Sequence, residues 1–341
     1  MKTTHLSTNT IEAMFKQLKL NFGGSITKEY QENILTIENE IGSGNVRGIS
    51  LQGGISYIEF DMVFSEDIII SIDTPNKNPI YFAYCSKGRL GHSFGSNGKK
   101  YILENFQTGI LTSRLVDENK LYFKKDVRSK LTLITVETSH SAKISGKDNL
   151  KNKLHNTFFK EASEDNFIYI GSQNLKIAEK IQQLNAIDQK GLVRSLLIQG
   201  LVHVILALEI QQHAEDQNRY IPVGSLTMRD MEIIKKATQY IKDNYHKQLS
   251  ISQLCTDFGL SPSKLQEGFK DMHERTVTDY IREVRILKAE ELIKNTDLNI
   301  SEVVYSIGFS SRSYFSKIFK ERFNCSPKDY KDAQKRLPIS A

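Results

Sequence analysis

A chain of 341 residues is too long for one typical hydrophobic core and indicates two domains. Its 39% hydrophobic and 25% charged residues are ordinary for a globular protein, and a net charge of +6 permits a polyanionic partner without requiring one. The three cysteines, Cys85, Cys255 and Cys325, lie far apart with no CxxC or cysteine–histidine spacing. This usage argues against a disulfide scaffold, a structural zinc site and export, so we expect a cytoplasmic protein.

The first part of the chain has the pattern of a β domain. After a short helical start at Ile11–Leu20, β-rich runs separated by Gly, Asn and Asp extend from Ile34 to about Glu137. In Ile58–Phe64 the even positions are apolar, which is the period of a half-buried strand. Many short strands at this spacing predict an antiparallel sandwich or barrel. Further runs of this kind are Ile68–Ile72, Ile80–Tyr84, Leu121–Phe123 and Leu131–Val136.

From about Asn149 onward the pattern is helical. A connecting stretch, Asn149–Ser172, leads to predicted helices at Asn174–Ala186 and Gln189–Gln212. The polar segment His213–Val223 is a candidate linker. A run of short helices follows from Thr227.

The segment Gly191–Ile210 is long and apolar enough to require comparison with a membrane span. Arg194, Gln199, His203 and Glu209 interrupt it, and charged groups are costly in hydrocarbon. Gln199 and His203, four residues apart, give the helix one polar stripe. We therefore predict a helix buried on most sides by protein, and no membrane partner.

Two segments in the last third of the chain share one layout. They are Ile251–Lys270 (ISQLCTDFGLSPSKLQEGFK) and Ile300–Lys320 (ISEVVYSIGFSSRSYFSKIFK). Each has an amphipathic helix, then Gly-apolar-Ser, then a second amphipathic helix ending Phe-Lys. Gly259 and Gly308 permit the positive φ that joins two short helices at a steep angle. This is the plan of a helix-turn-helix, whose second helix enters the DNA major groove.

The caps and cores of both segments follow the same plan. Ser261 and Ser310 are candidate N-caps, and Pro262 suits a first helical position. A predicted helix, Val277–Asn295, joins the segments and spans about 28 Å. It would hold two recognition helices about one DNA turn, ~34 Å, apart. The predicted core positions are Leu254, Phe258, Leu265 and Phe269 in the first segment, and Val303, Val304, Ile307, Phe315 and Phe319 in the second.

The residues Gly308–Lys320 followed by Phe323–Tyr330 (FNCSPKDY) resemble the signature of the AraC/XylS family of transcription regulators. The resemblance extends from about Arg229 to Arg336, roughly a third of the chain. Leu265–Phe269 (LQEGF), with the nearby Thr276-Val277 and Tyr280-Ile281-Arg282, is similar to the siderophore-regulator branch of that family.

The resemblance implies base contacts on the exposed face of each recognition helix. Arg312 would pair with guanine and Gln266 with adenine, while lysines and helix N-termini would hold phosphates. Glu267 departs from the family, which often has a basic residue there, and Glu274 and Asn324 replace its usual glycines. The residues implied to bind DNA are Ser263, Lys264, Gln266, Glu267 and Lys270 in the first segment, and Arg312, Ser313, Tyr314, Lys317 and Lys320 in the second.

Family resemblance also implies a cupin-like β sensor and a dimerisation helix ahead of this domain. The dimerisation residues would be Leu192, Leu196, Leu197, Leu201, Val204 and Leu208, unless this seam packs on Ile177, Ile181 and Leu184 of the same chain. His92, His140 and His155 are isolated, so no metal is expected and no cofactor is proposed. Aromatic residues such as Tyr57, Tyr81 and Tyr84 fit a plain core as well as an effector pocket, and the effector-binding residues are unknown.

Together these features predict an α+β multidomain protein. The expected parts are a cupin-like antiparallel β-sandwich or barrel with helices (1–148), a helical dimerisation and linker region (149–224), and an all-α double helix-turn-helix domain (225–341). The expected function is an effector-responsive, homodimeric activator that binds double-stranded DNA and contacts RNA polymerase. An alternative is a ligand-independent regulator whose β domain only contacts other proteins. Cys85 lacks the setting of an alkyl-transfer repair enzyme, so no enzymatic activity is expected.

Overall fold

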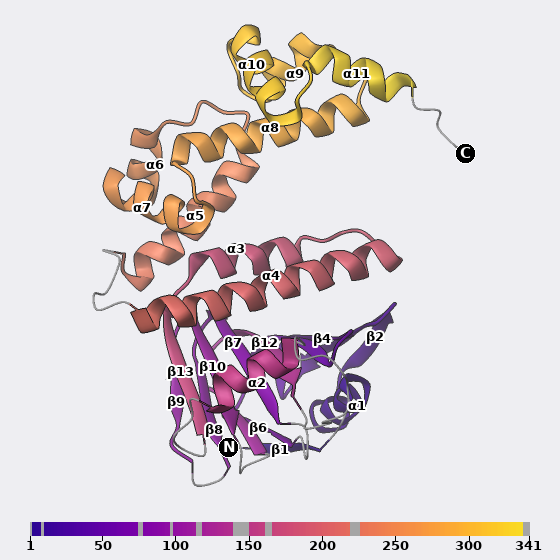
Figure 1. Ribbon diagram of the computed structural model, residues 1–341, viewed down its shortest axis with the longest axis vertical. Coiled ribbons are helices and arrows are strands. Elements are labelled where there is room, and N and C mark those ends of the chain that lie inside the picture. Colours follow the sequence, from indigo (N-terminus) through magenta and orange to yellow (C-terminus); the bar gives the residue numbers. More distant parts are fainter. Residues whose placement is uncertain are drawn as a thin grey trace. The chain divides into compact units, whose positions relative to one another are not determined.

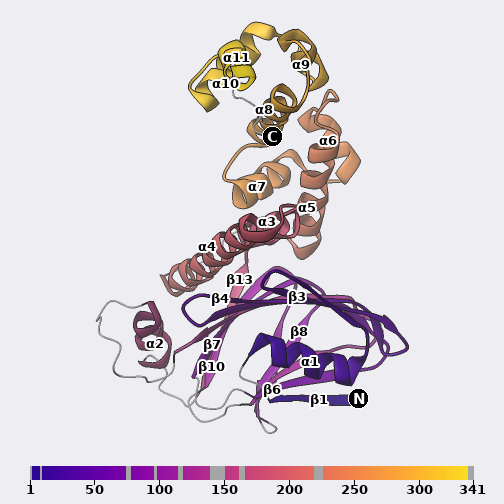
Figure 2. The same ribbon diagram turned by 90° about the vertical axis from the view of Figure 1, so that its right-hand side faces the viewer.

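The computed structural model describes residues 2–7, 10–73, 78–95, 98–113, 118–138, 150–160, 166–218 and 226–336. The chain divides into two compact units, Met1–Pro222 and Val223–Ala341. The first is rich in β-strands and the second is helical, as predicted (Figures 1 and 2).

The N-terminal unit contains two β-sheets. A five-stranded sheet has the order β1-β6-β11-β8-β9, and an eight-stranded sheet has the order β13-β10-β7-β12-β5-β4-β3-β2. Neighbouring strands are antiparallel except β1 and β6, which pair in parallel. The strands are β1 (Lys2–Ser7), β2 (Ser25–Glu29), β3 (Glu32–Asn39), β4 (Gly42–Leu51), β5 (Ile55–Phe64), β6 (Ile68–Asp73), β7 (Pro79–Lys87), β8 (Leu90–Phe94), β9 (Tyr101–Leu103), β10 (Gln107–Ser113), β11 (Glu118–Phe123), β12 (Ser129–Glu137) and β13 (Asn166–Gln173).

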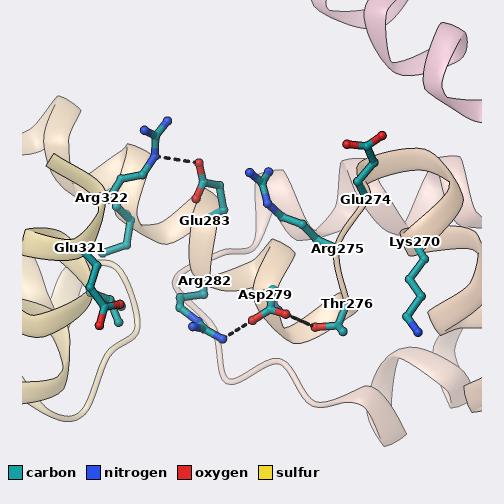
Figure 3. A pocket seen from close by; sticks show the side chains of 11 residues that line it. Lys270, Glu274, Arg275, Thr276, Asp279, Arg282, Glu283, Glu321 and Arg322 are labelled. Carbon is teal, nitrogen blue, oxygen red and sulfur yellow. Dashed lines mark hydrogen bonds and ion pairs between the residues drawn. The ribbon is translucent and has the colours of Figure 1, made fainter.

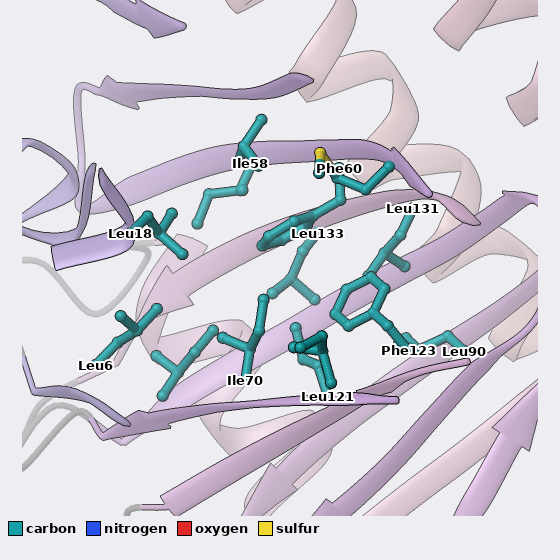
Figure 4. Close-up of a cluster of buried hydrophobic side chains, with 14 of the residues drawn as sticks. Leu6, Leu18, Ile58, Phe60, Ile70, Leu90, Leu121, Phe123, Leu131 and Leu133 are labelled. Carbon is teal, nitrogen blue, oxygen red and sulfur yellow. The ribbon is translucent and has the colours of Figure 1, made fainter. Parts of the chain in front are cut away.

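The core of this unit is made of side chains from both sheets. Phe60 of the larger sheet and Phe123 of the smaller one lie with ring centroids 5.5 Å apart (Figure 4). Leu121 and Leu133, from the smaller and larger sheets, are also fully buried in it. The alternation seen in the sequence places these apolar residues on the facing sides of the two sheets.

Several elements of this unit were not predicted, among them strands β1 and β2, which precede the expected β region. Helix α2 (Leu150–Lys160) and strand β13 lie where the sequence predicted a connecting stretch followed only by helices. Strand β13 pairs antiparallel with β10, with Ile110 opposite Tyr169. The prediction that all structure after Asn149 is helical is therefore wrong, because a distant strand supplies the hydrogen-bonding partners.

The remaining helices of this unit are α1 (Ile11–Phe22), α3 (Leu175–Asn185) and α4 (Gly191–Asn218). Figure 1 shows α3 and α4 side by side over strands of the larger sheet. The Tyr84 hydroxyl donates to the carbonyl of Asn174 at 2.6 Å, and Gln212 Nε2 donates to the carbonyl of Ser172 at 2.7 Å. These bonds join the start of α3 and the last part of α4 to the sheet.

Helix α4 differs from its prediction in burial and length. Ile198, Val202 and Ile205 are buried, but only 22% of its most apolar 18-residue stretch is buried. The prediction of a helix covered on most sides is therefore wrong for the single chain. The helix also continues to Asn218, so His213, which is buried, is not part of a linker. The rest of the predicted linker, 219–223, lies outside the described residues.

The C-terminal unit consists of seven helices in the described residues. Two apolar clusters form its interior, one around Leu254, Leu265 and Phe269 and the other around Val304 and Phe315. The predicted core position Phe258 is only half-buried. The helices are α5 (Met228–Asp243), α6 (Ile251–Phe258), α7 (Pro262–His273), α8 (Val277–Asn295), α9 (Ile300–Ser306), α10 (Arg312–Phe323) and α11 (Pro327–Arg336).

Candidate nucleic-acid interface

The first helix-turn-helix is formed by α6 and α7. Gly259 ends α6 with φ of 64°, in the left-handed region, as predicted. Ser261 is the N-cap of α7, because its Oγ accepts the N–H of Lys264 at 3.3 Å. Pro262 occupies the first helical position. The start of α7 is thus determined by residues that lie next to it in the sequence.

The second helix-turn-helix is formed by α9 and α10. Gly308 has φ of 82°, again as predicted. The predicted N-cap, Ser310, is wrong, because Ser311 Oγ accepts the N–H of Tyr314 at 3.2 Å. One more residue than in the first segment separates the glycine from its recognition helix. Positions in α7 therefore correspond to positions 50 residues later in α10.

The two recognition helices end in the same way. Glu274 and Asn324 have φ of 57° and 58°, and their N–H groups donate to the carbonyls of Lys270 and Lys320 at 2.9 and 2.8 Å. Each residue occupies the left-handed position that usually favours glycine or asparagine. The departure at Glu274 therefore keeps the helix end that the family resemblance implies.

Helix α8 has the predicted bounds, Val277–Asn295, and connects the two helix-turn-helix segments. The guanidinium of Arg285 donates to the carbonyls of Tyr245 at 2.8 Å and Lys247 at 2.7 Å. Burial lowers the pKa of Arg285. The middle of α8 is thereby attached to the segment that follows α5.

The residues of α7 that are implied to contact DNA differ in their exposure. Ser263 and Lys270 are exposed, whereas Lys264, Gln266 and Glu267 are only partly exposed. Lys264 Nζ lies 2.6 Å from Asp230 Oδ2, and Gln266 Oε1 accepts the N–H of Val277 at 3.2 Å. Ser263 Oγ also lies 3.1 Å from Ser261 Oγ, so at least three of the five side chains are engaged within the domain.

The implied DNA contacts on α10 are all exposed. They are Arg312, Ser313, Tyr314, Lys317 and Lys320. Tyr314 is 45% exposed, and its ring meets the ring of Phe309 edge-on at 6.0 Å. Cations and a positioned phenol on one exposed helix face are chemically suited to phosphates and base edges.

Residues 254–333 match the family model described as a helix-turn-helix domain. The chain is 29% identical over 113 residues to the xylose operon regulatory protein of Escherichia coli K12, which covers 33% of this chain and 29% of that protein. The C-terminal unit is an AraC-type DNA-binding domain. The AraC-type resemblance seen in the sequence is confirmed.

Other relatives match about a third of this chain within different proteins. A histidine kinase of Formosa agariphila is 32% identical over 30% of this chain and 8% of its own length. An uncharacterised helix-turn-helix regulator of Pseudoalteromonas carrageenovora is 32% identical over 29% of this chain and 58% of its own. An AraC-type regulator structure from Chromobacterium violaceum shows 25% identity and a TM-score of 0.30 over 33% of this chain and 99% of its own. The chain thus spans 8 to 58% of the length of the three curated relatives from Formosa agariphila, Pseudoalteromonas carrageenovora and Escherichia coli.

A groove of about 670 Å³ separates the two recognition helices of the AraC-type domain (Figure 3). Lys270 and Glu274 line it from the end of α7, and Glu321 and Arg322 line it from α10. Among its charged residues, Arg282 pairs with Asp279 and Arg322 pairs with Glu283 at 3.1 Å. The charged lining residues are four cations, Lys270, Arg275, Arg282 and Arg322, and four anions, Glu274, Asp279, Glu283 and Glu321.

Two groups that hold α7 residues in place were not predicted from the sequence. Asp230 belongs to a capping box with Thr227 at the start of α5, a local pattern that its Thr-x-x-Asp spacing could have indicated. Its contact with Lys264, 34 residues away, has no local signal. The same holds for the bond between Gln266 and the first residue of α8.

Proposed function

We propose that the chain is a sequence-specific transcription regulator that binds double-stranded DNA through α7 and α10. The observation that carries this proposal is the pair of capped helix-turn-helix segments on one connecting helix. Helix α8 has 19 residues and a length of about 28 Å. That length suits recognition helices placed in successive major grooves, about 34 Å apart.

The proposed base contacts come from the first turns of each recognition helix. Arg312 has the two-pronged donor geometry for guanine, and the Gln266 amide could pair with adenine. Ser263 and Glu267 in α7, and Ser313, Tyr314 and Lys317 in α10, complete the proposed set of base contacts. Lys264, Lys270 and Lys320 would neutralise phosphates.

A second copy of this chain is the proposed partner of α4. Four apolar side chains of the predicted seam are exposed, Leu192 at 59%, Leu196 at 58%, Leu197 at 42% and Val204 at 42%, and the neighbouring Val193 is exposed at 55%. Leu201 and Leu208, also predicted in the seam, are half-buried, while Ile177, Ile181 and Leu184 of α3 are buried. An apolar stripe that recurs over several turns is self-complementary in a helix pair, and a two-fold dimer buries it on both copies.

The membrane alternative for α4 accounts less well for its contacts. Within the described residues it is the one helix long and apolar enough, by length and composition, to cross a membrane. Its opposite face, however, carries Arg194, which pairs with Glu32 at 2.8 Å, and Gln212, which bonds to Ser172. A helix fastened to a sheet along one side leaves only a stripe for a partner, which suits a second helix better than lipid.

The β unit is the proposed sensor, with a cupin-like arrangement of its sheets. A cavity of about 170 Å³ lies between α1 and the sheets and is lined by Met14, Ile72, Tyr81 and Leu133 among others. Asn119 is paired in register with Ile72, and no hydrogen bond satisfies its buried amide within the described residues. A cavity lined by both apolar and polar side chains suits a small ligand that has its own polar groups.

His92 is a second buried polar group on the same inner face. It alternates with the core residues Leu90 and Phe94, and neither ring nitrogen has a hydrogen bond of regular geometry within the described residues, although the Asn119 side chain interacts with the ring. Burial lowers the pKa of His92 to about 4, so the ring is neutral at physiological pH.

We propose residues 1–148 as the sensor, 149–224 as the dimerisation and linker region, and 225–341 as the DNA-binding domain.

The full proposal is an effector-responsive activator in the cytoplasm that contacts RNA polymerase, without enzymatic activity or a cofactor. The alternative of a ligand-independent regulator is separated from it by melting the full chain with a library of small metabolites. A compound that raises the melting temperature of the β unit supports the sensor. If none does while DNA binding is retained, the β unit is a protein-contact module.

The test of DNA binding is selection from randomised duplexes with the full chain and with Arg312→Ala. A preferred sequence that Arg312→Ala relaxes at particular base pairs supports the proposal. Binding that is equally strong to random duplex and abolished by salt contradicts it, because phosphate contacts alone carry no sequence information.

A further inference from the structure

We infer that the two recognition helices are unequal, and that α10 supplies most of the sequence readout and affinity while α7 mainly docks. This inference rests on the proposed DNA-binding function and refines it. The two helices have the same length, and each is bounded by an N-cap serine and a left-handed C-cap residue, so equivalent positions can be compared.

The charge of the two helices differs at equivalent positions. Helix α7 contains two lysines and two carboxylates, whereas α10 contains two arginines, two lysines and one carboxylate. With the offset of 50 residues, Pro262 corresponds to Arg312 and Glu267 corresponds to Lys317. The offset follows from the N-cap at Ser311 rather than Ser310. Double-stranded DNA carries one phosphate charge per ~1.7 Å of its axis. It therefore attracts α10, which has an excess of positive charge, and not α7, whose two lysines are balanced by two carboxylates.

The side chains of α7 are also committed to the domain itself. Lys264 is paired with Asp230 at 2.6 Å, and the carbonyl oxygen of the Gln266 side chain accepts the N–H of Val277 at 3.2 Å. A new bond from Lys264 to a phosphate would have to replace an existing ion pair. Gln266 could offer adenine only its amide donors, so it loses the two-pronged geometry that makes such contacts specific.

The side chains of α10 that are proposed to contact DNA are not committed in this way. Within the described residues, no hydrogen bond or ion pair involves the side chains of Arg312, Lys317 or Lys320. Tyr314 is supported by the edge of Phe309 and still exposes 45% of its surface. A supported aromatic ring and three free cations need little rearrangement before they contact DNA.

The groove between the helices does not compensate for the weakness of α7. Its four cations are balanced by four carboxylates, and two of its arginines already pair within the groove. The positive charge that distinguishes the domain is therefore concentrated on α10. We expect a binding site with one strongly defined block of base pairs and one weakly defined block about a helical turn away.

The experiment removes the side-chain charge at the equivalent positions Glu267 and Lys317, and also at Arg312. The full chain, Lys317→Ala, Glu267→Ala and Arg312→Ala are compared on the selected duplex over a range of salt. We expect Lys317→Ala and Arg312→Ala to weaken binding about tenfold or more. If Lys317 neutralises a phosphate, Lys317→Ala also makes the fall of log affinity with log salt less steep, by about 0.9. Glu267→Ala weakens binding far less than Lys317→Ala does.

Arg312 and Lys317 are exposed and Glu267 is partly exposed, so loss of folding should not imitate loss of binding, and circular dichroism of each variant checks this. The inference is overturned if selection yields two equally defined blocks, or if Glu267→Ala weakens binding and relaxes a block as Arg312→Ala does. Absence of any preferred sequence for the unmodified chain instead contradicts the proposed function. These two failures are distinguished by the unmodified chain alone.

Discussion

The ammonium of Lys264, in the first turn of α7, lies 2.6 Å from Asp230 Oδ2 in the first turn of α5. This contact joins a recognition helix to the helix that opens the domain. The hydrogen bond from Lys264, together with those from Thr227, lowers the pKa of Asp230 to about 2. The pair contributes stability above the ordinary Asp pKa near 3.8, and this contribution is lost as the pH falls toward 2.

Replacing Asp230 should strengthen DNA binding through Lys264. In Asp230→Asn the amide oxygen can still accept the Thr227 N–H, but the lysine loses its counterion. We expect the salt slope of DNA binding to become steeper by about 0.9, the value for one added phosphate contact. The double variant Asp230→Asn, Lys264→Ala should restore the original slope. An unchanged slope in the single variant would show that Lys264 does not reach a phosphate.

Gln266 should affect stability more than base recognition. Gln266→Ala removes the acceptor for the N–H of Val277, and we expect a loss of about 1 kcal/mol in the free energy of unfolding. Gln266→Glu retains an acceptor oxygen and should recover most of this loss. Urea denaturation followed by circular dichroism measures both. Equal stability of all three proteins would mean that the bond contributes nothing.

The ion pair between Arg194 and Glu32 should be important for the attachment of α4 to the larger sheet. Both side chains are mostly buried, at 15% and 3% exposure, and Arg47 also lies 3.3 Å from Glu32. Arg194→Met leaves Glu32 with one partner, so we expect a loss of about 2 to 3 kcal/mol in urea denaturation. The matched control is Arg128→Met, which breaks an exposed pair with Asp61 and should cost less than about 1 kcal/mol.

Glu209 should make the N-terminal unit less stable as the pH rises. It is fully buried in α4, neither carboxyl oxygen has a hydrogen bond within the described residues, and burial raises its pKa well above 4.5. The folded state holds its proton more tightly than the unfolded state, so stability falls by about 1.4 kcal/mol per pH unit once the pH exceeds 4.5. This fall continues until the pH reaches the folded-state pKa.

Glu209→Gln removes this titration and keeps the shape of the side chain. We expect the variant to gain stability over the unmodified chain progressively as the pH is raised from 4.5 toward 8. Thermal melts at several pH values measure the difference. Parallel pH profiles for the two proteins would show that Glu209 is ionised in the folded state.

The exposed leucines of α4 should determine the oligomeric state. Leu196→Glu places a charge on the proposed seam at a side chain that is 58% exposed, so the dimer should dissociate while the fold is retained. Sedimentation velocity measures the mass, and circular dichroism measures the fold. Ile198→Glu is the contrasting variant, because Ile198 is 2% exposed and its replacement should unfold the unit. A Leu196→Glu protein of unchanged mass would exclude this seam.

Features of the C-terminal unit that depend on neighbouring residues could be predicted from the sequence alone. The bounds of α8, the N-cap at Ser261 and the left-handed glycines follow from side chains within four residues of each position. The alternation that defines Ile58–Phe64 as a strand is equally local. These short-range preferences are set by backbone sterics and capping, and they are the same in any fold.

Other features were decided only by tertiary contacts. Ser311, rather than Ser310, caps α10, and two adjacent serines offer the same local chemistry, so only the packed geometry of the turn selects one. Strand β13 exists because β10 supplies its hydrogen bonds from 50 or more residues away. Lys264 and Asp230, Gln266 and Val277, and Arg194 and Glu32 are distant in sequence. The sequence by itself determined where helices and turns begin and that the C-terminal unit resembles a DNA-binding domain. The tertiary structure decided which polar side chains are held within the protein, because hydrogen bonds and ion pairs depend on distance in space and not on separation along the chain.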